Sequence, residues 1–320
     1  RRAQCLNDEL GRSQTNSDNS ACGRLSCLFN VSPLVGASPA KQHVNRTGSR
    51  DEQGNFVTVC NGSQLPRLNA VVLQNKLPQA WRQLELVEET GSTNSDLLTR
   101  AAVGEDIDGI VLIAEHQTAG RGRAGRSWLS SPHSQITMSL GVSAAGVAAD
   151  GWGWLPLATG VAVVDALAPL TGTSIGLKWP NDVLAGEGKL AGILAEVASP
   201  KPTIVVGIGI NVVGHPDEAA VALADLGVAT NDRNELIPPL LYELGARIER
   251  WRAAGGADDR LIADYRSRSV TIGSRVRALL PGGGEIVGTA TSIDAQGRLL
   301  IDSGDQNFAV SAGDVVHLRH

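Results

Sequence analysis

The interpretation of this sequence turns on one stretch, Gly120-Arg121-Gly122-Arg123-Ala124-Gly125-Arg126. Its glycines let the backbone approach a ligand closely, and its arginines carry planar guanidinium groups that bind phosphate or carboxylate through paired hydrogen bonds. The apolar run at residues 109–114, just upstream, predicts a buried strand. Because guanidinium groups at the end of a buried strand are costly without a negative partner, the stretch predicts a loop that binds an anion.

The glycine spacing also spells Gly-x-Gly-x-x-Gly, which in dinucleotide-binding folds opens a helix and is followed about 20 residues later by an acidic residue. Here the loop runs into Ser127-Trp128-Leu129-Ser130-Ser131-Pro132-His133, which is no helix start, and the next acidic residue is Asp150. A dinucleotide site is therefore disfavoured. A solvent-exposed basic hairpin tip stays open as an interpretation of this stretch alone.

Composition sets outer limits on the function. The chain has 320 residues, enough for two domains, and its net charge of −5 argues against a broad nucleic-acid-binding surface. No apolar run is recognised as long enough to cross a membrane, and the sequence does not begin with a charged segment followed by an apolar one. We expect a cytoplasmic protein without membrane contact.

Residues 1–65 differ in composition from the rest. They are rich in Ser, Asn, Gly and Gln, show no apolar period, and contain all four cysteines, Cys5, Cys22, Cys27 and Cys60. Such a segment cannot bury enough apolar surface to offset the entropy of ordering it, so we expect a disordered extension without a DNA-binding helix-turn-helix. Because the sequence opens with Arg1 and its one methionine is Met138, whether residues 1–65 belong to the native protein stays open.

Downstream, the apolar patterns predict two regions. In residues 66–269, strands are predicted at 84–87, 109–114, 135–140, and as a hairpin at 190–197 and 203–211. Helices are predicted at 70–81, 157–170, 234–251 and 258–265. Residues 270–320 carry five short β runs separated by glycine turns, at 275–280, 285–293, 299–302, 308–310 and 315–318. That spacing predicts a small barrel.

Two further segments carry polar groups next to predicted elements. Ser92, Thr93 and Asn94 precede a helix in which Thr93 and Asp96 fit a capping box. The positive end of that helix would also suit a polar ligand, and the two interpretations are balanced. The second segment is Lys178-Trp179-Pro180-Asn181-Asp182, in which a turn explains the Pro-Asn-Asp part but neither the lysine nor the tryptophan.

The predicted hairpin carries a third set of polar and small residues. Lys189 heads its first strand, where a lysine most often keeps its charged end in water at a sheet edge. Gly207 and Gly209 are two residues apart, so they face the same side of the second strand and leave room for a flat ligand or a close backbone. Asn211 ends that strand.

Taken together, these segments resemble a biotin protein ligase. The resemblance is carried, in chain order between Trp81 and His320, by Ser92-Thr93-Asn94, Gly120 to Arg126, Lys178 to Asp182, Lys189 to Gly192 and Gly207 to Asn211. The combination of the arginine-glycine loop with Lys-Trp-Pro-Asn-Asp is highly specific. The resemblance implies an α/β (α+β) fold, in which a mixed β-sheet catalytic domain flanked by helices (66–269) is followed by a small SH3-like β-barrel (270–320).

The resemblance implies that the chain forms biotinyl-5′-adenylate from biotin and ATP, then passes biotin to one lysine of the biotin carboxyl carrier domain of a carboxylase. The carboxylate of biotin must attack the α-phosphorus of ATP, and the two anions repel each other. Arginines and a lysine at the meeting point would offset that repulsion. No side-chain nucleophile is needed, in agreement with a chain that has no cysteine after Cys60.

The resemblance also assigns roles to single residues. Those expected to bind biotin are Ser92, Thr93, Asn94, Gln117, Gly120, Arg121, Gly122, Arg123, Lys189, Gly192, Leu194 and Gly207. Those expected to bind ATP and the adenylate are Arg121, Arg123, Arg126, Trp128, Lys178, Asn181 and Asn211. The expected catalytic cations are Lys189, Arg121 and Arg123, and Asp182 is expected to receive the acceptor lysine.

Some features stay open at this point. Magnesium is implied by the ATP chemistry, although no carboxylate cluster in the sequence indicates its site. Ala124 stands where some relatives carry a further arginine, which puts the affinity of the loop in question rather than the chemistry. A monofunctional ligase, as a monomer or weak homodimer that binds no DNA, is the preferred reading. The alternatives are a bifunctional ligase and repressor, a lipoate ligase, and a binding module without turnover, against which Lys189 argues.

Overall fold

The computed structural model describes residues 49–50, 56–57, 65–215 and 219–318. Two short strands, β1 (Ser49–Arg50) and β2 (Phe56–Val57), pair antiparallel ahead of the main body. The remainder of the predicted disordered extension, and with it all four cysteines, lies outside the described residues.

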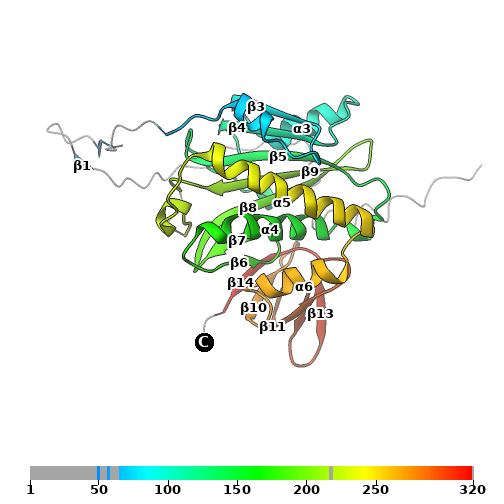
Figure 1. The fold of residues 1–320 in the computed structure, drawn as a ribbon. Coiled ribbons are helices and arrows are strands. Elements are labelled where there is room, and N and C mark those ends of the chain that lie inside the picture. Colours follow the sequence, from blue (N-terminus) through cyan, green and yellow to red (C-terminus); the bar gives the residue numbers. More distant parts are fainter. Residues whose placement is uncertain (1–48, 51–55, 58–64, 216–218, 319–320) are drawn as a thin grey trace, which may run out of the picture.

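A seven-stranded mixed sheet forms the centre of the molecule (Figure 1). Its strands are β3 (Gln83–Thr90), β4 (Ile110–Gln117), β5 (Gln135–Ser143), β6 (Ile175–Lys178), β7 (Asp182–Ala185), β8 (Gly188–Ala198) and β9 (Thr203–Asn211). They lie in the order β3-β4-β5-β9-β8-β7-β6, and β3 and β4 run parallel while the other neighbours are antiparallel. The predicted hairpin is confirmed as β8 and β9.

Helices cover both faces of this sheet. They are α2 (Ala70–Asn75), α3 (Thr93–Ala102), α4 (Trp154–Leu167), α5 (Arg233–Ala254) and α6 (Asp259–Arg268), and one-turn 3-10 segments are η1 (Arg123–Gly125), η2 (Ala149–Gly151), η3 (Ala168–Leu170) and η4 (Leu223–Leu226). Strand β4 alternates between the two sides: Val111 and Ile113 belong to the core shared with α4 and α5, whereas Ile110 and Leu112 pack with Leu97 of α3. The sheet is therefore the middle layer.

The hydrophobic helix α4 packs against β6, β7 and β8, and α5 lies beside it on the same face of the sheet and contacts β5 (Figure 1). The stretch Ala149–Leu170, which contains α4, is long and apolar enough to cross a membrane, contrary to the sequence-based expectation. However, 78% of its apolar window is buried inside the fold, which identifies it as a core helix. Its predicted start at residue 157 was also late, because Pro156 lies in the first helical turn, where proline is tolerated.

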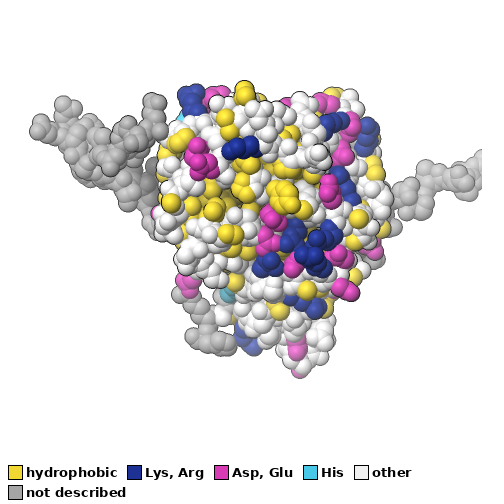
Figure 2. Space-filling view, in the orientation of Figure 1, with side chains coloured by type: hydrophobic (Ala, Val, Ile, Leu, Met, Phe, Trp, Pro, Cys, Tyr) yellow, Lys and Arg dark blue, Asp and Glu magenta, His cyan; other side chains and the backbone are white. Residues whose placement is uncertain are grey.

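A network of ion pairs ties the helices together on their outer side. Figure 2 shows basic and acidic side chains crowded over this part of the surface. Arg268 Nε lies 2.6 Å from Asp165 of α4, and Arg247 of α5 contacts both Asp165 and Asp264 of α6. These partly exposed pairs fix α4, α5 and α6 relative to one another.

The C-terminal region is a five-stranded antiparallel sheet. Its strands are β10 (Arg275–Leu279), β11 (Glu285–Ile293), β12 (Leu299–Asp302), β13 (Asn307–Val310) and β14 (Asp314–His317), in the order β13-β12-β11-β10-β14. It docks on the larger domain through two indoles, Trp154 and Trp179, which donate at 3.0 Å to the carbonyls of Asp294 and Gly297. The predicted α/β (α+β) class, with a mixed sheet flanked by helices and a small β domain after it, is confirmed.

Candidate active site

The amino end of α3 provides the first polar wall of the site. Ser92, not Thr93, caps the helix: its hydroxyl accepts from the backbone N–H of Ser95, so the predicted capping box is one residue out of register. Asp96 instead accepts a hydrogen bond from the Thr90 hydroxyl at 2.6 Å. The shift leaves Thr93 and Asn94 in the first turn, both buried.

A chain of buried hydrogen bonds holds these side chains in place. Gln117 Oε1 accepts from both the backbone N–H and the hydroxyl of Thr93, at 2.9 and 3.1 Å. Ser139 Oγ lies 2.7 Å from the Thr93 hydroxyl and 2.6 Å from Asn94 Oδ1. Because a serine hydroxyl has one proton, it can donate to one of these two acceptors at a time, so an acceptor remains available for a ligand N–H.

Glycines on β8 and β9 make room for two side chains of the protein itself. A Cβ on Gly207 would overlap Asn94 Oδ1, and one on Gly209 would lie 2.8 Å from Trp128 Nε1. Gly192, which pairs with Gly209 across the strands, would bring a Cβ to 3.0 Å from the same indole. The space expected for a flat ligand at Gly207 and Gly209 is thus filled by an amide and an indole, because both reach across the sheet from neighbouring elements.

The arginine-glycine loop is a tight turn folded back on itself. The backbone N–H of Trp128 donates to the Gly120 carbonyl at 2.8 Å, and that of Gly122 donates to Arg126 at 2.7 Å. Ala124 has φ 53° and Gly125 φ 74°, a left-handed conformation that glycine adopts freely and alanine only at a cost. The loop therefore presents its side chains outward from a compact backbone.

The arginines of the loop point to three different partners. Arg121 Nη2 lies 2.7 Å from the buried Glu196 carboxylate, Arg123 donates to Asn181 Oδ1 at 3.0 Å, and Arg126 pairs with Asp314 of β14 at 2.8 Å. Burial lowers the pKa of Arg123, although an arginine remains cationic. The predicted guanidinium cluster is therefore spread out along one side of the site and paired with groups of the same chain.

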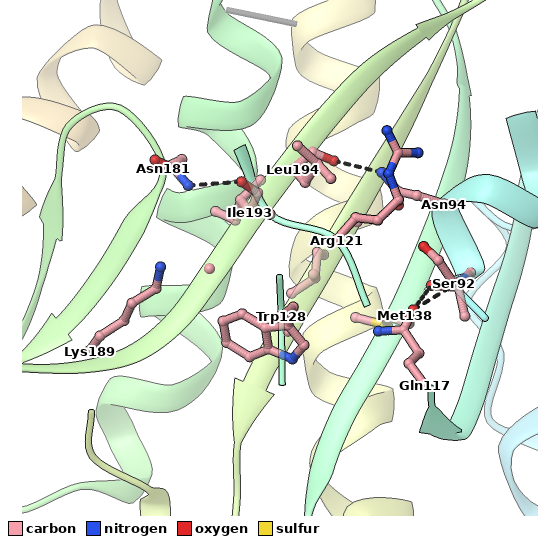
Figure 3. Close-up of a pocket in the computed structure, with 16 residues that line it drawn as sticks. Ser92, Asn94, Gln117, Arg121, Trp128, Met138, Asn181, Lys189, Ile193 and Leu194 are labelled. Carbon is pink, nitrogen blue, oxygen red and sulfur yellow. Dashed lines mark hydrogen bonds between the residues drawn. The ribbon is translucent and has the colours of Figure 1, made fainter. Parts of the chain in front are cut away.

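Lys189 lies opposite Arg121 across the pocket (Figure 3). Its ammonium is 2.7 Å from Asp182 Oδ1 and 5.7 Å from the centre of the Trp128 ring, a range in which a cation is attracted to an indole face. Asp182 Oδ1 is buried and has no hydrogen bond in the described part of the chain. The contact between Lys189 and Asp182 is therefore an ion pair, held by opposite charges at short distance.

These groups enclose one pocket with an empty volume of about 440 Å³. Its lining residues are Ser92, Thr93, Asn94, Gln117, Arg121, Gly122, Trp128, Met138, Asn181, Lys189, Gly192, Ile193, Leu194, Gly207, Ile208 and Gly209. Figure 3 shows Lys189 and Asn181 at one end, and Asn94, Ser92 and Gln117 at the other, with Trp128 between them. The pocket thus has a cationic end and a neutral polar end.

Six residues predicted for the site do not line this pocket: Gly120, Arg123, Arg126, Lys178, Asp182 and Asn211. Asn211 instead donates to the backbone carbonyls of Lys189 and Val221 at 3.1 Å. Lys178 and Asp182 line a smaller hollow behind the β6–β7 turn, which Asn181 shares with the main pocket. Their roles toward a ligand stay predictions.

Sequence reasoning missed several residues that build the pocket. Ser139 and Glu196 hold Asn94, and Gln135 holds both Trp128 Nε1 at 3.2 Å and Asn211 Oδ1 at 2.9 Å. Met138, Ile193 and Ile208, which were also missed, and Gly209, which was predicted to leave room for a ligand, complete the lining. Glu196 could have been found, because it is the one charged residue in the apolar run 190–197; such a residue rarely lies in a buried strand without a partner.

A protein-made metal site is not evident in the described residues. They contain no group of three or more His, Cys, Asp or Glu side chains that could hold a metal ion. Asp182 is the carboxylate at the cationic end, and it is engaged by Lys189. The donor set around the pocket therefore does not fit a magnesium ion bound by the protein alone, although magnesium can be held chiefly by substrate phosphates.

Comparison with known proteins groups the chain with one class of enzymes. The profile of the Biotin/lipoate A/B protein ligase family matches residues 87–212, and that of the Biotin protein ligase C terminal domain matches residues 271–318. The chain is 59% identical over 245 residues to a biotin--[acetyl-CoA-carboxylase] ligase of Mycobacterium tuberculosis, covering 75% of this chain and 90% of that protein.

Two more distant relatives agree. The chain is 35% identical over 225 residues to the bifunctional ligase/repressor BirA of Salmonella typhimurium, covering 66% of this chain and 67% of that protein. Its fold is similar to that of a biotin protein ligase from Aquifex aeolicus in complex with biotin and ATP, with a TM-score of 0.64 and 27% identity. That similarity covers 75% of this chain and 100% of the other.

Proposed function

This chain belongs to the biotin protein ligase family, and from that premise we propose that it activates biotin with ATP to biotinyl-5′-AMP and transfers biotin to a lysine of a carboxylase carrier domain. One observation carries the proposal: a single pocket joins a neutral polar end at Asn94 and Gln117, with Arg121 beside it, to a cationic end at Lys189. The ureido ring of biotin needs the first kind of group, and its carboxylate beside a phosphate needs the second.

In the first step, an oxygen of the biotin carboxylate attacks the α-phosphorus of ATP, and the bond to pyrophosphate breaks. Lys189 would contact both the carboxylate and the α-phosphate, which reduces their repulsion and stabilises charge in the transition state. To do so its ammonium has to move off Asp182, which lies 2.7 Å away. Arg121 and Arg123 would contribute further positive charge as the loop closes over the adenylate.

In the second step, the amine of the acceptor lysine attacks the carbonyl carbon of the adenylate, and AMP leaves. The amine must lose a proton, and Asp182 is the carboxylate nearest to Lys189 that could accept it. Its side chain is 23% exposed, so an incoming lysine can reach it. The nucleotide is proposed to contact Asn181 and Trp128, which both line the pocket. Further contacts are proposed for Asn211, Lys178 and Arg126.

The remaining expectations follow from this activity. We infer that magnesium arrives on the phosphates of ATP, and no step above is assigned to it. The partner is proposed to be a biotin carboxyl carrier domain, the compartment the cytoplasm, and the assembly a monomer or weak homodimer that binds neither DNA nor membrane. The match to a biotin protein ligase C-terminal domain at residues 271–318 favours this activity over lipoate ligation.

The test is incubation of the purified chain with biotin, ATP, magnesium and a carrier domain, followed by mass spectrometry of the carrier. A mass gain equal to one biotinyl group, dependent on ATP, is expected. A carrier domain whose acceptor lysine is replaced by arginine is the control. Incorporation of lipoate in place of biotin would contradict the proposal, and so would a carrier that gains no mass. A gel shift with operator DNA in the presence of biotin and ATP would add a repressor function.

A further inference from the structure

Glu196 lies at a point where the loop and the neutral end of the pocket meet. It is the charged residue in the otherwise apolar centre of β8, and its side chain is 1% exposed. One carboxylate oxygen, Oε1, accepts from Arg121 of the loop at 2.7 Å, and the other, Oε2, accepts from Asn94 Nδ2 at 2.9 Å. Neither of the two proposed reaction steps uses Glu196.

A carboxylate at this position determines which way the Asn94 amide faces. An ionised carboxylate can only accept hydrogen bonds, so the NH₂ group of Asn94 must face Glu196, and it also donates to the Leu194 carbonyl at 3.2 Å. The amide oxygen is thereby turned toward Ser139, at 2.6 Å, and toward the pocket. A neutral glutamine at position 196 could accept or donate, and would leave both amide orientations open.

The same carboxylate tethers the loop. Arg121 also donates to Ser95 Oγ of α3 at 3.2 Å, so its guanidinium bridges β8 and α3 over the pocket. Its side chain is 26% exposed, and water can therefore solvate it when the carboxylate is removed. Burial raises the pKa of Glu196, which indicates that its charge costs folding free energy rather than supplying it.

We propose that Glu196 is a positioning residue for the biotin half of the site: it fixes the Asn94 amide with its oxygen toward a ligand N–H, and it holds Arg121 over the pocket. The inference rests on the proposed function, because the ligand N–H is taken to be that of the ureido ring. It deepens that function by naming a residue that touches neither substrate and still sets the affinity for one of them.

Glu196→Gln tests the proposal because it keeps size and shape and removes the charge. Biotin binding measured by calorimetry without ATP should weaken about tenfold, which corresponds to ~1.4 kcal/mol. The melting temperature should stay the same or rise, because a buried charge has been removed and its partner is partly exposed. A residue with a merely structural role would instead lower both. Glu105→Gln, which removes a carboxylate paired with Arg100 at 2.6 Å outside the pocket, is the matched control and should change neither.

A second variant tests the amide orientation directly. Asn94→Asp alone sets two carboxylates against each other, and biotin binding should be lost almost completely. Adding Glu196→Gln to Asn94→Asp supplies a donor to the new carboxylate and leaves an acceptor oxygen facing the pocket. The double variant should therefore bind biotin at least about tenfold more tightly than the Asn94→Asp single variant, a rescue that independent sites would not give.

Three outcomes would overturn the proposal: unchanged biotin affinity in Glu196→Gln, a parallel loss of affinity and melting temperature, or no rescue in the double variant. Failure of the parent function looks different. If the unmodified chain itself does not bind biotin, the proposed ligase activity is wrong. If the unmodified chain binds biotin and Glu196→Gln binds it equally well, the ligase activity stands and only the role of Glu196 is wrong.

Discussion

Gly207 offers the sharpest test of how the neutral end of the pocket is built. It lies in the middle of the sheet, paired with Ser139 on β5 and with Leu194 on β8. A methyl group in Gly207→Ala would overlap Asn94 Oδ1 and lie 2.9 Å from Asn94 Cγ. Real Cβ contacts do not approach so closely, and both strands beside Gly207 are fixed by the sheet. The Asn94 side chain is therefore the group that has to move.

The expected size of the effect follows from what Asn94 would lose. Its amide takes part in three hydrogen bonds, with Ser139, Glu196 and the Leu194 carbonyl. A net contribution of about 1 kcal/mol for each gives a total of about 3 kcal/mol. If biotin needs the amide in its original place, the free energy of biotin binding becomes less favourable by up to this amount. That change corresponds to a loss of affinity of up to about a hundredfold.

The assay is calorimetric titration with biotin in the absence of ATP, and Gly209→Ala provides an internal comparison. Gly209 is two residues away on the same face of β9, but its new methyl group would lie 2.8 Å from Trp128 Nε1 and not near Asn94. This variant should keep most of its affinity for biotin and release the adenylate faster. Gly172→Ala, where a Cβ meets nothing within 4 Å, should behave as the unmodified chain.

The reasoning is wrong if Gly207→Ala binds biotin normally, or if the two strand variants lose biotin affinity to the same extent. The first result would mean that Asn94 can be displaced without cost to the ligand. The second would mean that Gly207 and Gly209 affect the same part of the site, and that the Asn94 amide and the Trp128 indole do not contact different parts of the ligand. Gly207→Ala and Gly209→Ala can both lower the melting temperature. Such a shared loss of stability does not explain why one variant loses biotin affinity and the other releases the adenylate faster.

Three further predictions concern the cations. Lys189→Ala should abolish adenylate formation with the fold intact, since the side chain is 36% exposed; pyrophosphate release near the normal rate would refute its role. Arg121→Ala and Arg123→Ala should let the activated intermediate leak into solvent because closure is weaker, and unchanged retention of labelled adenylate after gel filtration would contradict this. Asp314→Asn removes the partner of Arg126, and because both side chains are more than 40% exposed it should cost at most ~1 kcal/mol of stability. Adenylate should still dissociate several-fold faster from that variant, and an unaltered dissociation rate would show that the contact between the domains has no part in holding the loop.

Local pattern was sufficient for most of the fold. The alternating and continuous apolar runs predicted β4, β5 and the hairpin of β8 and β9, because burial on one or both faces of a strand leaves a direct mark on the sequence. It missed two strands of the central sheet, although the equally short strand β12 was predicted from the glycine turns on either side of it. Strands β6 and β7 span four residues each on either side of Trp179-Pro180-Asn181, too few for a period to be recognised beside such strong turn residues.

The candidate site shows where residue type is informative and where it is not. Arg121, Arg123 and Lys189 were predicted to share a cleft; Arg121 and Lys189 line the pocket, and Arg123 does not. Their carboxylate partners were not predicted, because Glu196 and Asp182 meet them through the packing of a loop on a sheet and through the pairing of β7 with β8. No spacing along the chain encodes those contacts.

These carboxylate partners change how the loop can bind an anion. A concentration of arginine in the sequence suggested positive charge awaiting an anion, yet Arg121, Arg126 and Lys189 each lie within 2.8 Å of a carboxylate of the same chain. An incoming anion must therefore exchange with Glu196, Asp314 or Asp182, and it gains only the difference between two charge-assisted contacts. A single phosphate has little to gain from such an exchange. A ligand that also fills the neutral end of the pocket gains binding free energy there, and this gain can offset the cost of separating the ion pairs. Occupation of the neutral end would then be a condition for the cations to exchange their carboxylate partners for the anionic groups of the ligand.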